Sequence, residues 1–244
     1  LAIEGDPGVS DDATSYLHKA TTELLLHLRY LGDKGWTPEG FDYLRYELNT
    51  GVLPFVQAYR HVKGINLADS SENINWFLPF YLMQNVSSKE GYITPDYGPS
   101  GIRWNTNRWR SGDLVMGIGS VPEMFLPAVL WSFDPVFGMS GDQTFDVFKP
   151  SDAVFTMVNY PFEVKPENPV LVLPKVWEDK KAGYYAIRNR WQDHNDYITT
   201  ITTNALARRG AHSHREAGSF RIIGLGEVWA SRGKKTPGEV FESD

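Results

Sequence analysis

The sequence contains no cysteine, which excludes disulfides and zinc sites built on Cys ligands. It also has no apolar run near the roughly 20 residues that a membrane-spanning helix needs, so we expect no membrane association. The sequence opens at Leu1 with no initiator Met and no signal-peptide pattern, and we expect a processed product or a piece of a longer protein. Its 244 residues, 41% of them hydrophobic, allow one large folded domain or two smaller ones.

Acidic residues are scarce in one part of the chain. Residues 181–235 hold ten Lys or Arg against four Asp or Glu, whereas the whole chain has a net charge of −6. Such a basic region fits either a site for an anionic ligand or a solvated basic sheet face. No nucleic-acid-binding motif accompanies it, and we expect no nucleic-acid partner.

Aromatic residues make up 14% of the chain, with 8 Trp and 12 Tyr. They fit a sugar-binding cleft, and they fit ordinary core packing equally well. Two of the tryptophans and their basic neighbours stand in the long polar stretch 88–112, where Arg103, Trp104, Arg108 and Trp109 are candidates to clamp and stack on an acidic sugar. The alternative is a loop held to the protein by its own aromatic side chains.

The hydrophobic pattern changes character near residue 150, which indicates an α+β protein with two parts. Residues 1–150 are predicted to be mainly helical and residues 151–244 mainly β-strand. Helices are expected at 11–32, 40–63, 73–85 and 121–133, with an ordered loop at 88–112. Strands are expected at 153–158, 183–188, 197–203 and 219–223.

The run 210–220 carries two of the six histidines, His212 and His214, two residues apart. On a strand these side chains share one face with Glu216. Two imidazoles and a carboxylate on one face can hold a metal ion or transfer protons. The alternative is a pair of ordinary strand histidines. Small residues at 217–219 allow a backbone or a substrate to approach closely.

Three stretches resemble the heparinase II/III-like polysaccharide lyases. The first is 33–46, with Gly-Trp-Thr-Pro-Glu-Gly followed by Tyr43 and Tyr46, and it is similar to a segment near the end of that family's helical toroid. The second, 126–131, is similar to its last toroid helix. The third combines 183–188 with 212–220, which resembles the opening sandwich strands and the His-x-His motif.

This resemblance implies the C-terminal part of an (α/α) toroid followed by an antiparallel β-sandwich. It also implies β-elimination on a uronic-acid-containing polysaccharide, with an acid, a base and a neutralised substrate carboxylate. His212 would be the first His of the motif, with an acid–base or charge-neutralising role, and Tyr46 or Tyr43 the catalytic tyrosine, Tyr46 being preferred. The substrate-binding candidates are Arg103, Trp104, Arg108 and Trp109 of the long polar stretch, together with Arg188, Arg190 and Glu39. Arg188 and Arg190 are expected to share one strand face, near the His motif if the sandwich forms as usual.

His214 and Glu216 would be the metal ligands, with zinc or calcium as the implied ion. The family usually has Asp where Glu216 stands, and a further Asp after Gly-Glu-x-Trp-Ala, whereas Ser231 and Arg232 follow Ala230 here. A metal site would therefore lack one family ligand unless Glu216 or Glu227 replaces it.

Two other functions are compatible with the same residues. A glycoside hydrolase on this scaffold would need two carboxylates across a cleft, for which Glu39 and Glu216 are the available pair. A non-catalytic glycan-binding protein is the second alternative. In each case the expected partner is an acidic polysaccharide or oligosaccharide, with further segments of the same protein or a homo-oligomer, and the expected location is periplasmic or secreted.

Overall fold

The computed structural model describes residues 8, 10–29, 31–37, 52–88, 91–95, 103–105, 117–131, 154, 157–203 and 217–230. Its helices are α1 (Ser10–Arg29), α3 (Val52–Lys63), α4 (Glu72–Gln84) and α6 (Leu126–Trp131). Short 3-10 helices cover Leu67–Ser70, Glu123–Phe125 and Pro169–Leu171. A small sheet consists of β1 (Val86–Ser88), β2 (Gly91–Thr94) and β3 (Arg103–Asn105). A larger sheet consists of β4 (Val176–Asp179), β5 (Tyr184–Arg188), β6 (Tyr197–Thr202), β7 (Ser219–Gly224) and β8 (Glu227–Ala230).

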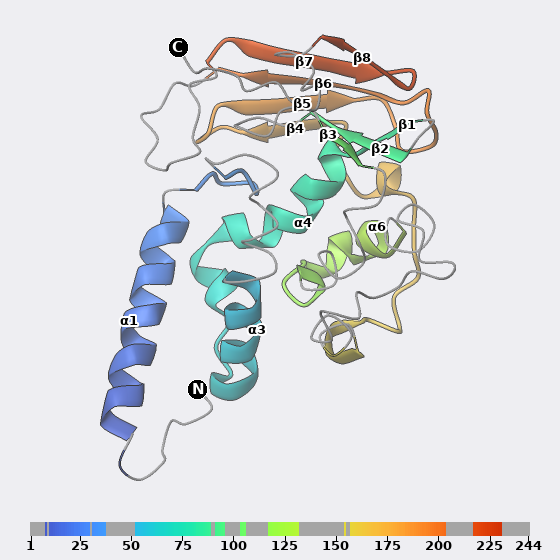
Figure 1. Cartoon of the computed structure of the whole chain (residues 1–244). Helices are drawn as coiled ribbons and strands as arrows, with labels where there is room; N and C mark the ends of the chain where they lie inside the picture. The colour runs from blue at the N-terminus through green and yellow to red at the C-terminus, as the bar shows by residue number, and fades with distance from the viewer. Residues whose placement is uncertain are drawn as a thin grey trace.

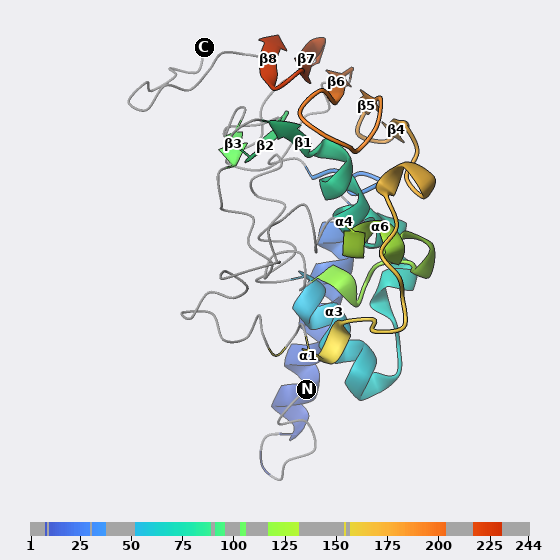
Figure 2. The ribbon, with the colours of Figure 1, turned by 90° about the vertical axis from the view of Figure 1, so that its right-hand side faces the viewer.

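The five strands of the larger sheet follow one another in chain order, and every neighbouring pair is antiparallel. Figure 1 shows this sheet above the helices, with α4 leading up to it and β1–β3 beneath it. The edge-on view in Figure 2 shows the larger sheet as the outermost layer. Helices therefore cover one face of this sheet.

The α4 helix is the centre of the core because its sequence is apolar on nearly every side. Phe77, Phe80, Tyr81 and Met83 are fully buried within it. A helix that is apolar all round must be enclosed by other elements. Here α4 lies between the other helices and the inner face of the larger sheet, and Tyr184 on β5 contacts its Phe80 ring.

The mixed α+β class is confirmed, as are the helix at 73–85 and the strands at 183–188, 197–203 and 219–223, each within one or two residues. The strand expected at 153–158 is wrong where the structure describes it, since 154 and 157–159 are helical. The stretch 88–112, expected to be a loop, contributes β2 and β3. The helix expected at 121–133 is a 3-10 turn and the short α6. No helix in the described ranges is both long and apolar enough to cross a membrane.

Candidate functional site

A junction between the helical part and the larger sheet forms around Asp179, the last residue of β4. Its carboxylate is fully buried and accepts hydrogen bonds from backbone N–H groups of the segment 31–37, which follows α1. Oδ2 accepts from Lys34 at 2.8 Å, Asp33 at 3.0 Å and Trp36 at 3.4 Å. Oδ1 accepts from Ala182 at 3.0 Å and from Asp33 at 3.2 Å. One carboxylate thus connects segments about 145 positions apart in the chain.

Two glycines let the segment 31–37 pass this close to its neighbours. A Cβ at Gly32 would stand 2.0 Å from Oδ2 of Asp179, which is inside van der Waals contact. Gly35 has a φ of +90°, and a Cβ there would stand 2.5 Å from the Trp76 carbonyl oxygen. The backbone conformation and the close approach both require glycine at position 35. The Gly-Trp pattern noticed in the sequence therefore has a packing role.

The turn 180–183 connects Asp179 to the residues that follow β6. Thr203, the first residue after β6, donates its backbone N–H to the Gly183 carbonyl at 2.7 Å, and its hydroxyl donates to the same oxygen at 3.1 Å. Gly218 N–H donates to the Thr202 carbonyl at 2.7 Å, just before β7 begins. Since Thr202 and Ser219 are register partners, residues 203 and 218 leave the sheet side by side. The connection between β6 and β7, which contains the His-x-His motif, therefore starts beside the turn that Asp179 holds.

A second carboxyl group accompanies Asp179. Burial is the main cause that raises the pKa of Asp33 above its ordinary value of 3.8, and hydrogen bonding and charge repulsion from Asp179 add to it. No Lys or Arg side chain of the described ranges forms an ion pair with Asp179. The junction is consequently an acidic site held mainly by backbone dipoles.

Below the junction, aromatic rings join α4 to the sheet. The rings of Trp76 and Trp177 meet edge-to-face with centroids 4.9 Å apart, and Phe80 lies 5.6 Å from Tyr184. Trp177 also donates its indole N–H to the Lys34 carbonyl at 3.2 Å. Edge-to-face pairs of this kind add to the stabilisation from burial. The segment 31–37 is therefore held from the α4 side and from the sheet side.

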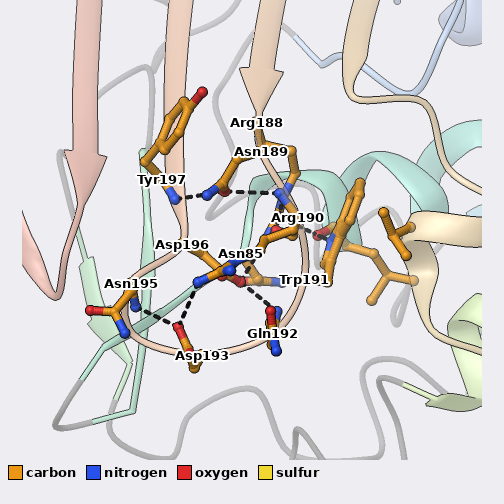
Figure 3. Close-up of polar contacts among 12 residues, drawn as sticks. Asn85, Arg188, Asn189, Arg190, Trp191, Gln192, Asp193, Asn195, Asp196 and Tyr197 are labelled. Carbon is orange, nitrogen blue, oxygen red and sulfur yellow. Dashed lines mark hydrogen bonds and ion pairs between the residues drawn. The ribbon is translucent and has the colours of Figure 1, made fainter.

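Arg188 lies at the opposite end of β5, and its guanidinium points into the protein (Figure 3). Its side chain is 1% exposed. Nη1 donates to the carbonyls of Leu82, Met83 and Asn85 at 3.3, 3.0 and 2.8 Å, which are groups at the C-terminal end of α4. These carbonyls have no partner within the helix, and a cation is favourable at this end of the helix dipole.

The remaining contacts of Arg188 complete this cluster. Nε and Nη2 donate to the Arg190 carbonyl at 3.0 and 2.8 Å, and the guanidinium stacks on the Trp191 ring at 4.0 Å. Burial lowers the pKa of Arg188 to about 9, and the nearby charge of Asp196, at 3.9 Å, opposes this shift. The guanidinium is therefore charged at neutral pH, and its donors are used inside the protein.

Arg190 is half-exposed and lies after the end of β5, in the turn before β6. Its Nε pairs with Asp196 at 3.0 Å, and its Nη2 pairs with Asp193 at 3.3 Å. The six residues of β6 span about 17 Å, which is the distance between this turn and the start of the connection from β6 to β7. Arg188 and Arg190 were expected on one strand face, and this is wrong, because β5 ends at Arg188 and Arg190 lies in the following turn. The His motif itself lies outside the described residues. The contacts of Arg188 give its guanidinium a structural role at the end of α4.

The other candidate residues are placed as follows. Arg103 and Trp104 belong to β3, where they are the register partners of Thr94 and Ile93. The expected catalytic, metal-binding and remaining substrate-binding residues lie outside the described residues: His212, Tyr46, Tyr43, His214, Glu216, Glu39, Arg108 and Trp109. Among the residues that are described, no group of three His, Asp or Glu side chains could hold a metal ion.

Asp179 and Asp33 were not singled out in the sequence. A local signal for Asp179 exists, because Asp at a strand end before a turn ending in Gly183 is typical of a side chain that accepts turn N–H groups, as it does from Ala182. The contacts with 33–36 have no local signal.

Comparison with known proteins adds no assignment to this geometry. No family model matches the chain, and no curated protein matches it significantly.

Proposed function

We propose that this chain belongs to a polysaccharide lyase with a heparinase II/III-like scaffold, acting by β-elimination on a uronic-acid-containing polysaccharide. The observation that carries the proposal is the junction around Asp179. It joins residues 33–36 of the first resembling stretch to the turn before β5, and through that turn to Thr203 at the end of β6. Stretches that resemble one family at separate places in the sequence thus meet at one end of the sheet.

The proposed chemistry uses groups on the two segments that leave this junction. A base removes the proton from C5 of the uronic acid, and the electron pair forms a C4–C5 double bond as the C4–O bond breaks. An acid then protonates the leaving oxygen. His212 and Tyr46, with Tyr43 as the alternative tyrosine, are proposed for these two steps. Arg103, Arg108, Trp104, Trp109 and Glu39 are proposed for substrate binding. His214 and Glu216 are proposed to hold a structural zinc or calcium ion.

The proposed scaffold is the end of an (α/α) toroid followed by a β-sandwich. The outward face of the larger sheet supports the sandwich, because apolar side chains lie on it across neighbouring strands. Ile201 and Phe220 form one register pair, and Ile187 and Ile222 both flank Thr199 in the next row. Phe220 is 56% exposed and Ile187 41% exposed. A sheet with two apolar faces is typical of one that is covered on both sides.

Incubation with a panel of acidic polysaccharides (heparan sulfate, chondroitin, alginate, ulvan and glucuronan) tests the function. The measurement is ultraviolet absorbance of the unsaturated uronyl product. We expect a rise on at least one substrate, and a loss of kcat of about 100-fold or more in His212→Ala. His194→Ala, an exposed histidine in the turn before β6, is the matched control and should keep the activity. New reducing ends without absorbance would indicate a hydrolase, and no cleavage at all would contradict an enzymatic function.

A further inference from the structure

We propose that Asp179 is a positioning residue for the proposed lyase, and the inference rests on that function. Its role is to fix the segment that leads to Tyr43 and Tyr46 relative to the hairpin that carries His212. Asp179 touches neither group, and it acts through the backbone on both sides of the junction.

The two carboxylate oxygens divide this work. Oδ2 accepts from Lys34 and Asp33 at 2.8 and 3.0 Å, which holds the helical side. Oδ1 accepts from Ala182 at 3.0 Å, which holds the turn of the sheet side. The turn in turn holds Thr203 through the Gly183 carbonyl. Both sides are therefore tied to one side chain with no exposed surface.

A buried carboxylate is an expensive way to join two segments if stability alone is needed. Removing a carboxylate from water is unfavourable, and apolar residues can join packed elements equally well. What the carboxylate adds is geometry, since charge-assisted hydrogen bonds are short and directional. Catalytic groups supplied by separate segments need such fixed placement, because displacement by about 1 Å can reduce a rate about 100-fold.

The test variant is Asp179→Asn in the full chain, because an amide has nearly the same shape but one acceptor oxygen instead of two. It can satisfy either 33–36 or Ala182, and its NH2 group then faces the N–H donors on the other side. Asp179→Ala, which removes both acceptors, is the stronger variant. Tyr184→Phe is the matched control, since it loses one buried sheet-to-helix hydrogen bond, from the Tyr184 hydroxyl to Gln84 at 2.7 Å, and keeps both Asp179 acceptors.

Hydrogen exchange followed by mass spectrometry reads the placement without any need for activity. We expect the amides of 33–36 or of Ala182 to lose at least tenfold protection in Asp179→Asn, and both sets to lose it in Asp179→Ala. Tyr184→Phe should keep both. Unchanged protection at both sites in Asp179→Asn would overturn the inference, whether or not the protein is a lyase. If Asp179→Ala loses protection throughout the protein, it has unfolded, and the result of Asp179→Asn decides between the outcomes.

Kinetic measurements on the polysaccharide that the wild type cleaves then separate a positioning role of Asp179 from a purely stabilising one. In Asp179→Asn we expect kcat to fall at least tenfold while KM changes less than threefold, because substrate contacts remain and the alignment of catalytic groups is lost. Tyr184→Phe should stay within about twofold on both. Lost protection with an unchanged kcat would overturn the catalytic importance of the junction. A wild-type protein that cleaves nothing would overturn the proposed function, and that outcome is read before any variant is made.

Discussion

Arg188 and Asp179 lie at opposite ends of the larger sheet, and each is a buried charged side chain that forms hydrogen bonds with backbone groups of the helical part. Arg188 donates to carbonyls at the end of α4, whereas Asp179 accepts from N–H groups of 31–37. In both places a charged side chain satisfies main-chain groups that have no partner in a helix or sheet. The same purpose is thus served by opposite charges at the two ends.

The two sites differ in what surrounds the charge. Arg188 has an acidic neighbour, Asp196, whose second partner is Arg190. Asp179 has a second carboxyl group beside it, that of Asp33, and the pKa of Asp33 is raised mainly by burial. Among the described residues, the Arg188 cluster pairs two arginines with two carboxylates, whereas the Asp179 junction holds two carboxyl groups and no ion-paired cation. This difference predicts that the first site governs stability and the second responds to pH.

The largest effect is expected from Arg188→Met, which fills part of the volume and removes every donor. The Met83 and Asn85 carbonyls lose their bond to Arg188, the Leu82 carbonyl keeps only its bond from the Trp191 indole N–H, and buried Asp196 loses one of two cations. We expect the free energy of unfolding to fall by about 3–5 kcal/mol. Urea titration followed by circular dichroism measures this. Arg190→Gln, at a half-exposed position, is the control with an expected loss of about 1 kcal/mol, and equal losses would contradict the structural role of Arg188.

Gly35→Ala should come next, and it strains the other end of the sheet. The new Cβ would meet the Trp76 carbonyl oxygen and the Phe80 side chain, and the φ of +90° is unfavourable for alanine. We expect a loss of about 2–4 kcal/mol from overpacking and backbone strain together. Thermal unfolding is the measurement. Gly64→Ala is a sharp control because Gly64 also has a positive φ, +69°, but open space around its Cβ. A loss no greater than that of the control would mean that 31–37 is not held closely against α4.

The sequence predicted the elements at this interface better than their contacts. The helix at 73–85 and the strand at 183–188 follow from hydrophobic pattern and β-branched content, which are local properties. The inward direction of Arg188 does not follow locally. Its strand alternates Tyr184, Ala186 and Arg188 on the buried face. A buried arginine is favourable there largely because carbonyls at the end of α4, about 105 positions earlier, accept its hydrogen bonds.

The same limit applies to the candidate site. The Gly-Trp pattern at 35–36 was noticed, and the glycine requirement is explained by packing against Trp76 and Phe80. Asp179 has a local turn signal, but its contacts with 33–36 could not be predicted, because these partners are distant in the sequence and are backbone groups, which leave no residue-type signal. The Arg188–Arg190 pair was misplaced because an expected strand face extended past the true strand end at Arg188.

A smaller effect is expected from Tyr184→Phe, which compares hydrogen bonding with packing near the middle of the interface. The ring and its edge-to-face contact with Phe80 remain, and only the hydrogen bond to Gln84 is lost. We expect a decrease of about 1 kcal/mol in the free energy of unfolding. Urea titration measures it, with Tyr16→Phe on the exposed surface of α1 as control. A loss above about 3 kcal/mol would show that polar contacts, more than ring packing, dock α4 to the sheet.

Asp33→Asn should have the smallest effect and the opposite sign. The folded protein binds the Asp33 proton more tightly than the unfolded chain, whose ordinary pKa is 3.8, so ionisation of Asp33 costs stability. This cost is absent below about pH 3.8, grows as the pH rises toward the raised pKa, and is complete above that raised pKa. The amide removes it and can donate to Asp179, so the variant should be more stable than wild type at pH 7, with a gain that shrinks on acidification.

Thermal unfolding of this variant from pH 3.5 to pH 7.5 measures the effect, and Glu163→Gln, an exposed position, controls for the change in net charge. A gain that is the same at every pH would assign the stabilisation to the new hydrogen bond and not to removal of a charge. A loss at pH 7 would mean that the two carboxyl groups do not repel. In that case the junction would be electrically balanced like the Arg188 cluster, and the contrast between the two ends of the sheet would fail.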